Sequence, residues 1–362
     1  MLILIIGILL KALIILAIFS VLIIVHEAGH FFAALRAGVR VERFALGFGK
    51  KIFSIKRGKT EYSINIIPLG GYVKLAGENP YERKGGKDEF YSKPVRSRFG
   101  VIVAGPIANY LLAFFILVGL YMVGMPTLTS EIGRVLDSSP ALSAGLKSGD
   151  MITAIDNKQV NYWQEVVQII RADKEALPLA IQVKRGTETI NMQVTPRIIK
   201  AENIFKQKHE FVGIGIAPSE KVIMLKTKPF NSFNLAAKHV WFFTAATYKG
   251  IWLLVTGAMP IKENVGGPIR IVSVISSAIK YGWYSVLSIT ATISLALAIF
   301  NLLPFPILDG GHILFLGIEK LRGRPLSEKA QEIMTQVALF LLIAFFLYVS
   351  YYDVRAVTGF GK

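Results

Sequence analysis

The sequence contains no cysteine, so disulfide bonds and thiolate metal sites are excluded, and any bound metal must be held by nitrogen and oxygen ligands. Charge is also scarce, because only 18% of the 362 residues are charged while 53% are hydrophobic. The mean hydropathy of +0.50 lies above that of ordinary soluble domains. The composition therefore predicts a membrane protein that works in a lipid bilayer.

The net charge of +17 is large for so apolar a chain. A basic chain can bind nucleic acid, but these lysines and arginines gather beside apolar segments, which is typical of membrane orientation. Residues 31–99 carry 15 Lys or Arg against 6 Asp or Glu, whereas residues 126–235 carry 14 against 11. We therefore expect no nucleic-acid partner, and we expect residues 31–99 on the cytoplasmic side of the membrane.

Four apolar segments are long enough to cross a membrane as helices: residues 1–35, 101–125, 286–303 and 333–352. The first could instead be a cleaved secretory signal, but it shows neither a clear early basic region nor a clear small-residue cleavage site. Residues 234–259 are ambiguous, since Lys238 and Lys249 interrupt them. We expect an amphipathic helix at the membrane surface there, with a fifth span as the alternative.

Two insertions separate the spans. Residues 36–99 show strand-like alternation interrupted by Pro68, Gly70 and Gly71, which predicts a small membrane-associated β-sheet with a kinked edge strand. Residues 138–160, "SSPALSAGLKSGDMITAIDNKQV", resemble the core of a PDZ domain, and short strands are expected at residues 181–183 and 190–194. The predicted fold class is therefore a polytopic α-helical membrane protein with a small β-sheet and an inserted PDZ-like α+β domain on the extracytoplasmic side.

The expected organisation follows the chain in order. Its segments are a first transmembrane helix (1–35), a β-hairpin region (36–99), a second transmembrane helix (100–125), a PDZ-like domain (126–218), a linker with the interfacial helix (219–282), a third transmembrane helix (283–312), a cytoplasmic loop (313–330), a fourth transmembrane helix (331–353) and a tail (354–362).

Three ionisable residues interrupt the first apolar run in the pentad "HEAGH", which begins at His26. In a helix the two histidines of an H-E-x-x-H pattern lie on one face and can bind one zinc ion, while Glu27 beside them can act as a general base. Ionisable groups inside a membrane helix cost about 2.5–3.5 kcal/mol each, so they are rare without a partner such as a cation. Two histidines facing a polar seam between helices are the structural alternative.

Tetrahedral zinc needs a third protein ligand besides two histidines and water. In "NLLPFPILDGG", Asp309 follows an apolar helix that Pro304 and Pro306 should break, so its carboxylate could turn back toward the histidines. An aspartate in an ordinary turn is the alternative. Lys11 lies 15 residues before His26, or about 22 Å along a helix, which puts the metal nearer the cytoplasmic face.

These motifs, together with "AGPIAN" in the second span and the PDZ-like insertion, resemble the site-2 protease family of intramembrane zinc metalloproteases, in its regulator-of-sigma-E protease branch. The resemblance covers nearly the whole chain, although this chain has room for one PDZ-like domain where relatives carry two, and Ala296 stands where some relatives have asparagine. The site residues that it implies are the zinc ligands His26, His30 and Asp309, the catalytic Glu27, and the substrate-binding Asn109, Gly70, Gly71, Tyr72 and Asn301.

The resemblance implies one zinc ion per chain and hydrolysis of peptide bonds inside transmembrane segments of single-pass proteins, such as anti-sigma factors or signal-peptide remnants. It also implies an upstream site-1 protease that acts on the same substrate. A non-catalytic membrane adaptor that holds partners through the PDZ-like domain is the alternative, and a transporter is a third one, disfavoured because paired inverted halves are missing. The identity of the substrate and of the cleaved bond does not follow from the sequence.

Overall fold

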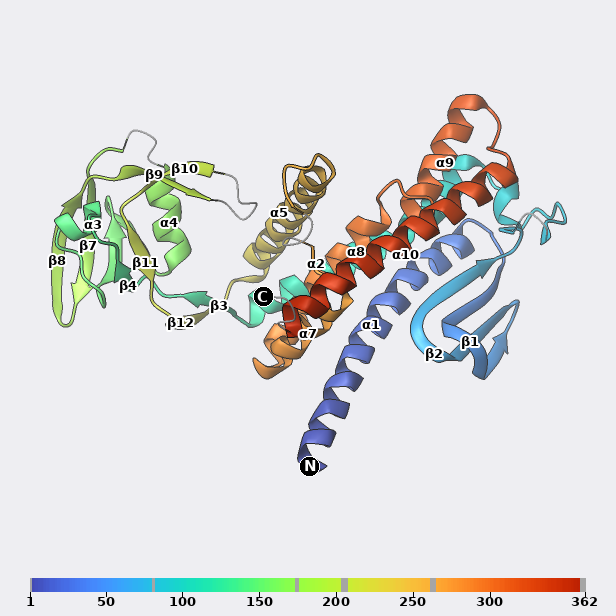
Figure 1. The fold of residues 1–362 in the computed structure, drawn as a ribbon, viewed down its shortest axis with the longest axis horizontal. Coiled ribbons are helices and arrows are strands. Elements are labelled where there is room, and N and C mark those ends of the chain that lie inside the picture. Colours follow the sequence, from blue (N-terminus) through green and yellow to red (C-terminus); the bar gives the residue numbers. More distant parts are fainter. Residues whose placement is uncertain (1, 80–81, 173–175, 203–207, 261–264, 359–362) are drawn as a thin grey trace. The chain divides into compact units, whose positions relative to one another are not determined.

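The computed structural model describes residues 2–79, 82–172, 176–202, 208–260 and 265–358. The chain divides into two compact units (Figure 1). Unit 1 comprises Met1–Leu120 and Phe233–Lys362, and unit 2 comprises Tyr121–Ser232. Unit 1 holds most of the helices, and unit 2 holds most of the short strands. The candidate site lies within unit 1.

Among the residues that the structure describes, seven α-helices lie wholly or mostly in unit 1. They are α1 (Leu2–Arg36), α2 (Val95–Val123), α5 (Pro229–Val255), α7 (Pro268–Lys280), α8 (Trp283–Asn301), α9 (Asp309–Arg322) and α10 (Glu328–Thr358). Four of them, α1, α2, α8 and α10, are long and apolar enough to cross a membrane, which confirms the four predicted helices. Helix α5 is a continuous helix of 27 residues but is not one of the four.

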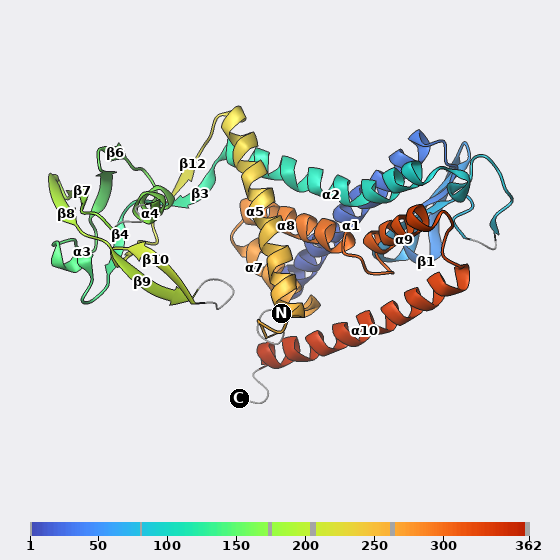
Figure 2. The same ribbon diagram turned by 90° about the horizontal axis from the view of Figure 1, so that it is seen from above.

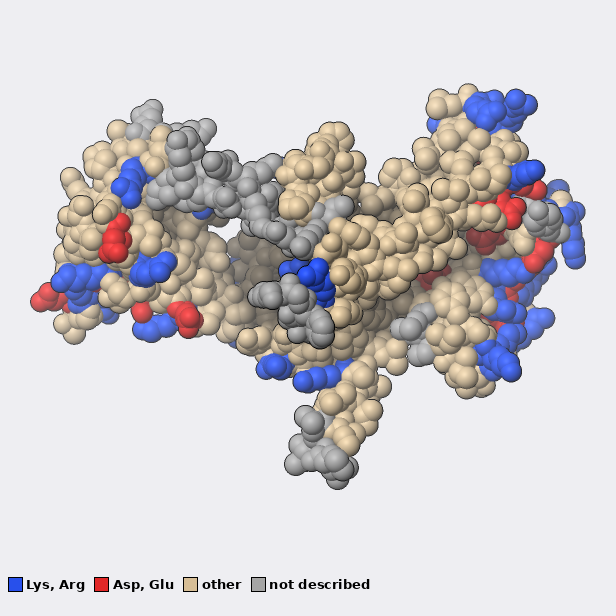
Figure 3. All heavy atoms as spheres, in the orientation of Figure 1, with Lys and Arg blue, Asp and Glu red and all other residues tan. Residues whose placement is uncertain are grey.

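Of these four helices, α1 and α10 expose apolar side chains along most of their length. Only 11% of the most apolar window of α1, and 11% of that of α10, is buried inside the protein. In Figure 3 most of the visible face of α10 carries no charge, while lysine, arginine and acidic residues gather around the β1–β2 sheet and the turn between α9 and α10. An uncharged band beside a charged end is the pattern expected of helices that face lipid.

The sheet of unit 1 consists of two long strands, β1 (Val41–Arg57) and β2 (Thr60–Leu75). Residues 43–46 of β1 pair twice, on one side with residues 71–74 and on the other with residues 61–64. The chain therefore passes from one side of β1 to the other at residues 68–70, where Gly70 adopts φ +106°, a value that favours glycine. Gly71 to Leu75 form an outer edge of the sheet.

The sheet is fixed to the end of α1 by an apolar cluster. Phe31 and Ala34 of α1 pack with Val41 and Leu75 of the sheet and with Val101 of α2. Each such side chain contributes about 1.5–3 kcal/mol when it is removed from water. The edge at Gly71 to Leu75 is thereby held beside the turn of α1 that carries the H-E-x-x-H pentad.

The chain between α8 and α9 breaks where the prolines predicted a break. Helix α8 ends at Asn301, and α9 begins at Asp309. An acidic residue in the first turn of a helix interacts favourably with the helix dipole and so stabilises this start. A Cβ atom on Gly310 or Gly311 would lie within 2.6 Å of the backbone of the preceding turn, so only glycine fits this close return. The return brings Asp309 back toward α1.

The segment 283–312, expected as the third transmembrane helix with its proline motif, divides at the predicted break, since α8 ends at Asn301 and α9 begins at Asp309. The expectation of a loop at residues 313–330 was wrong, because residues 313–322 belong to helix α9. Helix α9 forms because it can bury Phe315 and Leu316, and because Glu319 makes a bidentate ion pair with the buried Arg98 of α2. Figure 2 shows α9 lying apart from the long, unbroken α10 that follows it.

The expected linker 219–282 also contains more structure than the sequence indicated. Besides α5 it forms α7, whose buried Ile275 packs against Ile18 and Leu22 of α1. The N-terminus of α7 is capped by the buried Asp353 of α10, which accepts hydrogen bonds from the backbone N–H groups of Gly267 (3.2 Å) and Arg270 (2.9 Å). Such capping satisfies donors that a helix start leaves free.

Unit 2 is an α+β domain built around an apolar core. Its central sheet has the order β6-β5-β7-β8, and helix α4 covers the core with Val166 and Ile170. The elements of unit 2 are β3 (Met125–Leu128), β4 (Ile132–Val135), α3 (Pro140–Ser143), β5 (Met151–Ile155), β6 (Lys158–Gln159), α4 (Trp163–Ala172), β7 (Leu179–Arg185), β8 (Glu188–Val194), β9 (Arg197–Glu202), β10 (Lys208–Gly213), β11 (Ile216–Pro218) and β12 (Val222–Leu225). Strands β7 and β8 confirm the two predicted strands.

A buried ion pair gives unit 2 a pH-dependent stability. Burial favours the neutral form of Asp150, but hydrogen bonds from Arg185 and from the N–H of Lys147 outweigh burial and lower the pKa of this carboxyl. A lowered folded-state pKa adds stability above the unfolded pKa of about 4 and loses it as the pH falls further. We expect Asp150→Asn to lower the free energy of unfolding of unit 2 by about 2 kcal/mol at pH 7 and to remove most of its acid sensitivity below about pH 4.

Pulse proteolysis of the full chain in detergent at increasing urea concentrations measures this difference. Asp137→Asn is the matched control, because Asp137 is an exposed aspartate of the same unit and should change neither quantity. Equal urea midpoints for wild type and Asp150→Asn at pH 7 would contradict the prediction.

Candidate active site

The H-E-x-x-H pentad lies on α1 as expected, with both imidazole rings on one face and their centroids 4.8 Å apart. The Nε2 atoms of His26 and His30 are 3.2 Å apart. On its far side the His30 ring is oriented by a 2.9 Å hydrogen bond between Nδ1 and the carbonyl of Val101 on α2. Because Nδ1 carries the proton in this bond, a neutral His30 presents an unprotonated Nε2.

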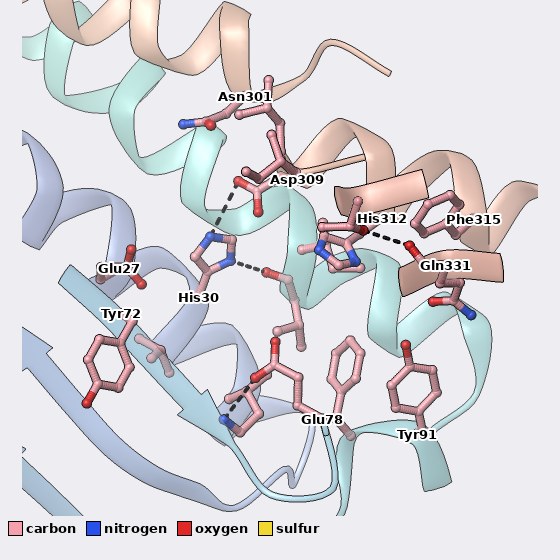
Figure 4. A pocket seen from close by; sticks show the side chains of 18 of the residues that line it. Glu27, His30, Tyr72, Glu78, Tyr91, Asn301, Asp309, His312, Phe315 and Gln331 are labelled. Atoms are coloured by element: carbon pink, nitrogen blue, oxygen red, sulfur yellow. Dashed lines mark hydrogen bonds and ion pairs between the residues drawn. The ribbon is translucent and has the colours of Figure 1, made fainter. Parts of the chain in front are cut away.

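Asp309 completes a triangle with these two nitrogens. Its Oδ2 lies 3.2 Å from Nε2 of His26 and 3.5 Å from Nε2 of His30, as Figure 4 shows for His30. This buried oxygen has no hydrogen bond of acceptable geometry. Three lone-pair atoms from α1 and α9, 280 residues apart in the sequence, therefore converge on one point.

The triangle has the size of a zinc site. In tetrahedral zinc sites the nitrogen and oxygen ligands lie about 2.0–2.2 Å from the metal, which places neighbouring ligand atoms about 3.3–3.6 Å from each other. The observed separations of 3.2, 3.2 and 3.5 Å are close to this range. Among the described residues, His26, His30 and Asp309 are the one group of three such side chains close enough to hold a metal ion.

Close packing of α1 against α2 fixes the His30 ring. A Cβ atom on Gly105 would lie within 2.8 Å of three atoms of this ring, and a Cβ atom on Gly29 would lie within 2.9 Å of Ala104 and Ala108. Both contacts are shorter than real side chains tolerate. Gly105 of the "AGPIAN" motif, which has no side chain, thus leaves the space that the His30 ring occupies.

Glu27 lies between the histidines and the outer edge of the β-sheet. The Cγ atom of Glu27 is 3.4 Å from the place where a Cβ on Gly71 would lie, and its carboxylate accepts a hydrogen bond from the backbone N–H of Val73. A carboxylate at this position is next to the metal-ligand triangle and next to any chain that pairs with the edge strand. This is the arrangement that a general base requires.

Alternation along the edge strand shows which backbone groups point outward. The N–H of Ala76 donates to the carbonyl of Arg40, toward the inner side of the sheet, so the N–H groups of Gly71, Val73 and Leu75 point outward. The outward N–H of Leu75 donates to Glu78 Oε2 at 3.2 Å, and that of Val73 donates to Glu27. Two carboxylates thus occupy the positions that the carbonyl groups of an added strand would take.

These groups line one cavity of about 570 Å³. Its inner wall carries the histidines, Glu27 and Asp309, and its outer wall carries polar residues of the β2–α2 connection and of α10, including Glu78, Glu328 and Glu332. Figure 4 shows Glu78, Tyr91, His312 and Gln331 around the same space. Burial raises the pKa of the Glu78 carboxyl, although the hydrogen bond from Leu75 opposes the rise.

The remaining predicted residues divide into two groups. Asn301 and Tyr72 line the cavity, and Gly70 and Gly71 lie at the bend and along the outer edge of the sheet. Asn109 is 1% exposed and is not among the residues that line the cavity, but its amide faces the back of His26.

Reasoning from the sequence missed Gly105 and Glu78. The glycine in "AGPIAN" was the available signal for the first, whereas Glu78 is an ordinary acidic residue after a strand.

Two imidazole nitrogens and a carboxylate oxygen that converge on one point, with a second carboxylate beside them, are the arrangement found in metal-dependent hydrolases. Comparison with known proteins gives the family. The model of peptidase family M50 matches residues 14–345, and the chain belongs to this family of site-2 proteases, which are metalloproteases that use zinc.

Similar proteins cover nearly the whole chain. The regulator of sigma-W protease RasP of Bacillus subtilis is 30% identical over 93% of this chain and 96% of its own length. The regulator of sigma-E protease RseP of Salmonella typhimurium is 28% identical over 90% of this chain and 94% of its own. Among solved structures, the PDZ domain of an SdrC-like protein from Listeria monocytogenes matches 24% of this chain and 84% of its own at 26% identity, with a TM-score of 0.20.

Proposed function

We propose that this protein is an intramembrane zinc metalloprotease that hydrolyses peptide bonds within the transmembrane segments of single-pass membrane proteins. The observation that carries the proposal is the triangle of His26, His30 and Asp309 with Glu27 beside it, on a helix whose surface is almost entirely apolar. A zinc site in a cavity beside such a helix would meet a peptide bond that lies at the depth of the membrane.

His26, His30 and Asp309 would hold the zinc ion. When bound, zinc supplies Lewis-acid chemistry, because it makes water more acidic and polarises a peptide carbonyl. Glu27 accepts the proton of the attacking water and later donates it to the amine nitrogen as the peptide bond breaks. The water oxygen ends on the new carboxyl group, and the proton ends on the new amine.

The edge strand would hold the substrate. A transmembrane helix satisfies its own backbone hydrogen bonds, so it must unwind before its carbonyl groups can be attacked. Pairing with the outward N–H groups of Val73 and Leu75 replaces the lost bonds, as in other cases of strand addition. Val73 donates to Glu27 in the free protein, so a substrate carbonyl there lies next to the general base.

This binding mode predicts an effect of Glu78. A substrate strand must displace its carboxylate from the N–H of Leu75. We therefore expect Glu78→Ala to lower the KM of a transmembrane substrate about threefold to tenfold with little change in kcat, since one charge-assisted hydrogen bond no longer competes. Glu78→Gln keeps an acceptor oxygen and serves as the matched control. Steady-state cleavage in liposomes measures both constants, and a raised KM in Glu78→Ala would oppose this mode of binding.

The relatives point to a regulatory role. RasP and RseP are named as regulators of sigma-W and sigma-E, so anti-sigma factors in a bacterial inner membrane are the substrates that we propose first, trimmed beforehand by a site-1 protease. We further propose that the zinc site faces the cytoplasmic side and that unit 2, as a PDZ-like domain, lies outside. A non-catalytic adaptor would have no use for the converging ligand triangle.

Removal of the metal tests the proposal. Purified protein in liposomes should contain about one zinc ion per chain and should cut a single-pass model substrate. We expect dialysis against a chelator to abolish cleavage and added zinc to restore it. Cleavage that continues at the same rate in protein shown to be free of metal would contradict a zinc-dependent function.

A further inference from the structure

The side chain of Asn109 is buried behind the metal-ligand triangle rather than in the substrate cavity. It comes from α2 and is 1% exposed. Its Nδ2 lies 3.5 Å from Nδ1 of His26, while its Oδ1 is buried and has no hydrogen-bond partner. A buried amide oxygen without a donor costs about 1–3 kcal/mol.

A half turn of the amide about its last side-chain bond exchanges the two atoms and brings Oδ1 to the position 3.5 Å from Nδ1 of His26. Oδ1 then faces Nδ1 of His26 and accepts its proton, since a neutral imidazole with a free Nε2 carries its proton on Nδ1. Nitrogen and oxygen of an amide have nearly the same size, so no other atom needs to move.

The second histidine shows the same arrangement. His30 donates from Nδ1 to the carbonyl of Val101, and Val101 precedes Asn109 by eight residues, about two turns, on α2. One face of α2 therefore offers an oxygen acceptor to each imidazole. Each acceptor directs the opposite nitrogen, Nε2, toward Asp309.

The position of Asn109 is itself fixed by a third helix. The hydroxyl of the fully buried Ser294 on α8 donates to the backbone carbonyl of Asn109 at 2.8 Å. This bond ties α2 to α8 at the turn that carries the amide, so the distance from Asn109 to His26 does not depend on the side chain alone.

We propose that Asn109 is a positioning residue for zinc binding, whose Oδ1 accepts a hydrogen bond from Nδ1–H of His26 and so keeps Nε2 unprotonated and aimed at the metal. This inference rests on the zinc site of the proposed function, and it replaces the expected contact of Asn109 with substrate. Partners of this kind typically change metal affinity by 10- to 100-fold when they are removed.

The test compares zinc affinities of the full-length protein in detergent, measured by competition with a chelating dye. Asn109→Leu has a similar volume but no acceptor, and we expect it to bind zinc 10- to 100-fold more weakly with an unchanged thermal midpoint. Asn109→Asp keeps an acceptor oxygen and should bind zinc within about threefold of wild type. Gly119→Ala, at a position of α2 where a Cβ atom would have no other atom within 4 Å, is the control for general helix packing and should also stay within about threefold.

Two outcomes would overturn the inference. Unchanged zinc affinity in Asn109→Leu, together with a raised KM, would assign Asn109 to the substrate. Equal losses of zinc affinity in Asn109→Leu and Asn109→Asp would show that a hydrogen-bond acceptor at position 109 does not determine zinc binding. Failure of the proposed function is distinguishable from both, because wild-type protein would then contain no stoichiometric zinc.

Discussion

Replacing Glu27 with glutamine is expected to reduce peptide-bond cleavage by about 10²- to 10⁴-fold while the protein keeps its zinc. Glutamine has nearly the same shape but cannot accept a proton from water. The zinc ligands in the proposed site are His26, His30 and Asp309, and none of them is changed. Cleavage rates in liposomes and zinc content by mass spectrometry, measured on the same preparation, check both halves of the prediction.

Glu188→Gln is the matched control for this experiment, since it makes the same chemical change at an exposed position of unit 2. It should leave cleavage and zinc content as in wild type. Full activity in Glu27→Gln would show that Glu27 is not the general base. Loss of zinc together with activity would instead make Glu27 a part of the metal site.

The second large effect is expected at a glycine. Gly105→Ala adds one methyl group, which would lie within 2.8 Å of three atoms of the His30 ring. The ring must therefore move away from Asp309, or α2 must move away from α1. A misplaced ligand weakens tetrahedral coordination, so we expect zinc affinity to fall at least 100-fold and cleavage to be lost at ordinary zinc concentrations.

Helix α2 supplies its own control for this substitution. A Cβ on Gly119 would have no atom within 4 Å, and alanine favours a helix over glycine by about 1 kcal/mol. Gly119→Ala should therefore bind zinc and cleave as well as wild type. If Gly105→Ala also bound zinc as tightly as wild type, the claim that Gly105 leaves the space needed by the His30 ring would be wrong.

Much of the site was predictable because it is written in short motifs. The spacing of His26 and His30 places both rings on one helix face whatever the rest of the fold does, and the structure brings them within 3.2 Å. Pro304 and Pro306 predicted that the helix before Asp309 would break, and it does. Local rules sufficed in both cases.

The sequence could not indicate what depends on long-range register. Which N–H groups of β2 point outward follows from a double pairing of β1 and from the bend at Gly70, and neither can be read from alternation alone. The partner of Glu78 follows from that register. The expected loop at residues 313–330 was wrong for a similar reason, since α9 is stabilised by Arg98, more than 200 positions earlier.

The partner of the Asn109 amide could not be predicted from the sequence either. The motif "AGPIAN" drew attention to it, and the resemblance implied contact with substrate, but only the packing of α2 against α1 shows that its nearest polar partner is His26. The side of a helix that a polar residue occupies decides its role, and neighbouring helices decide that side.

The proposed zinc site should cut peptide bonds inside a membrane-spanning segment of the substrate. Mass spectrometry of the products released from a single-pass substrate in liposomes, with zinc-loaded wild type and Glu27→Gln side by side, tests this proposal most directly. We expect a new pair of ends within the apolar segment of the substrate with wild type and none with Glu27→Gln. An intact substrate with zinc-loaded wild type, or cuts only outside the apolar segment, would contradict it.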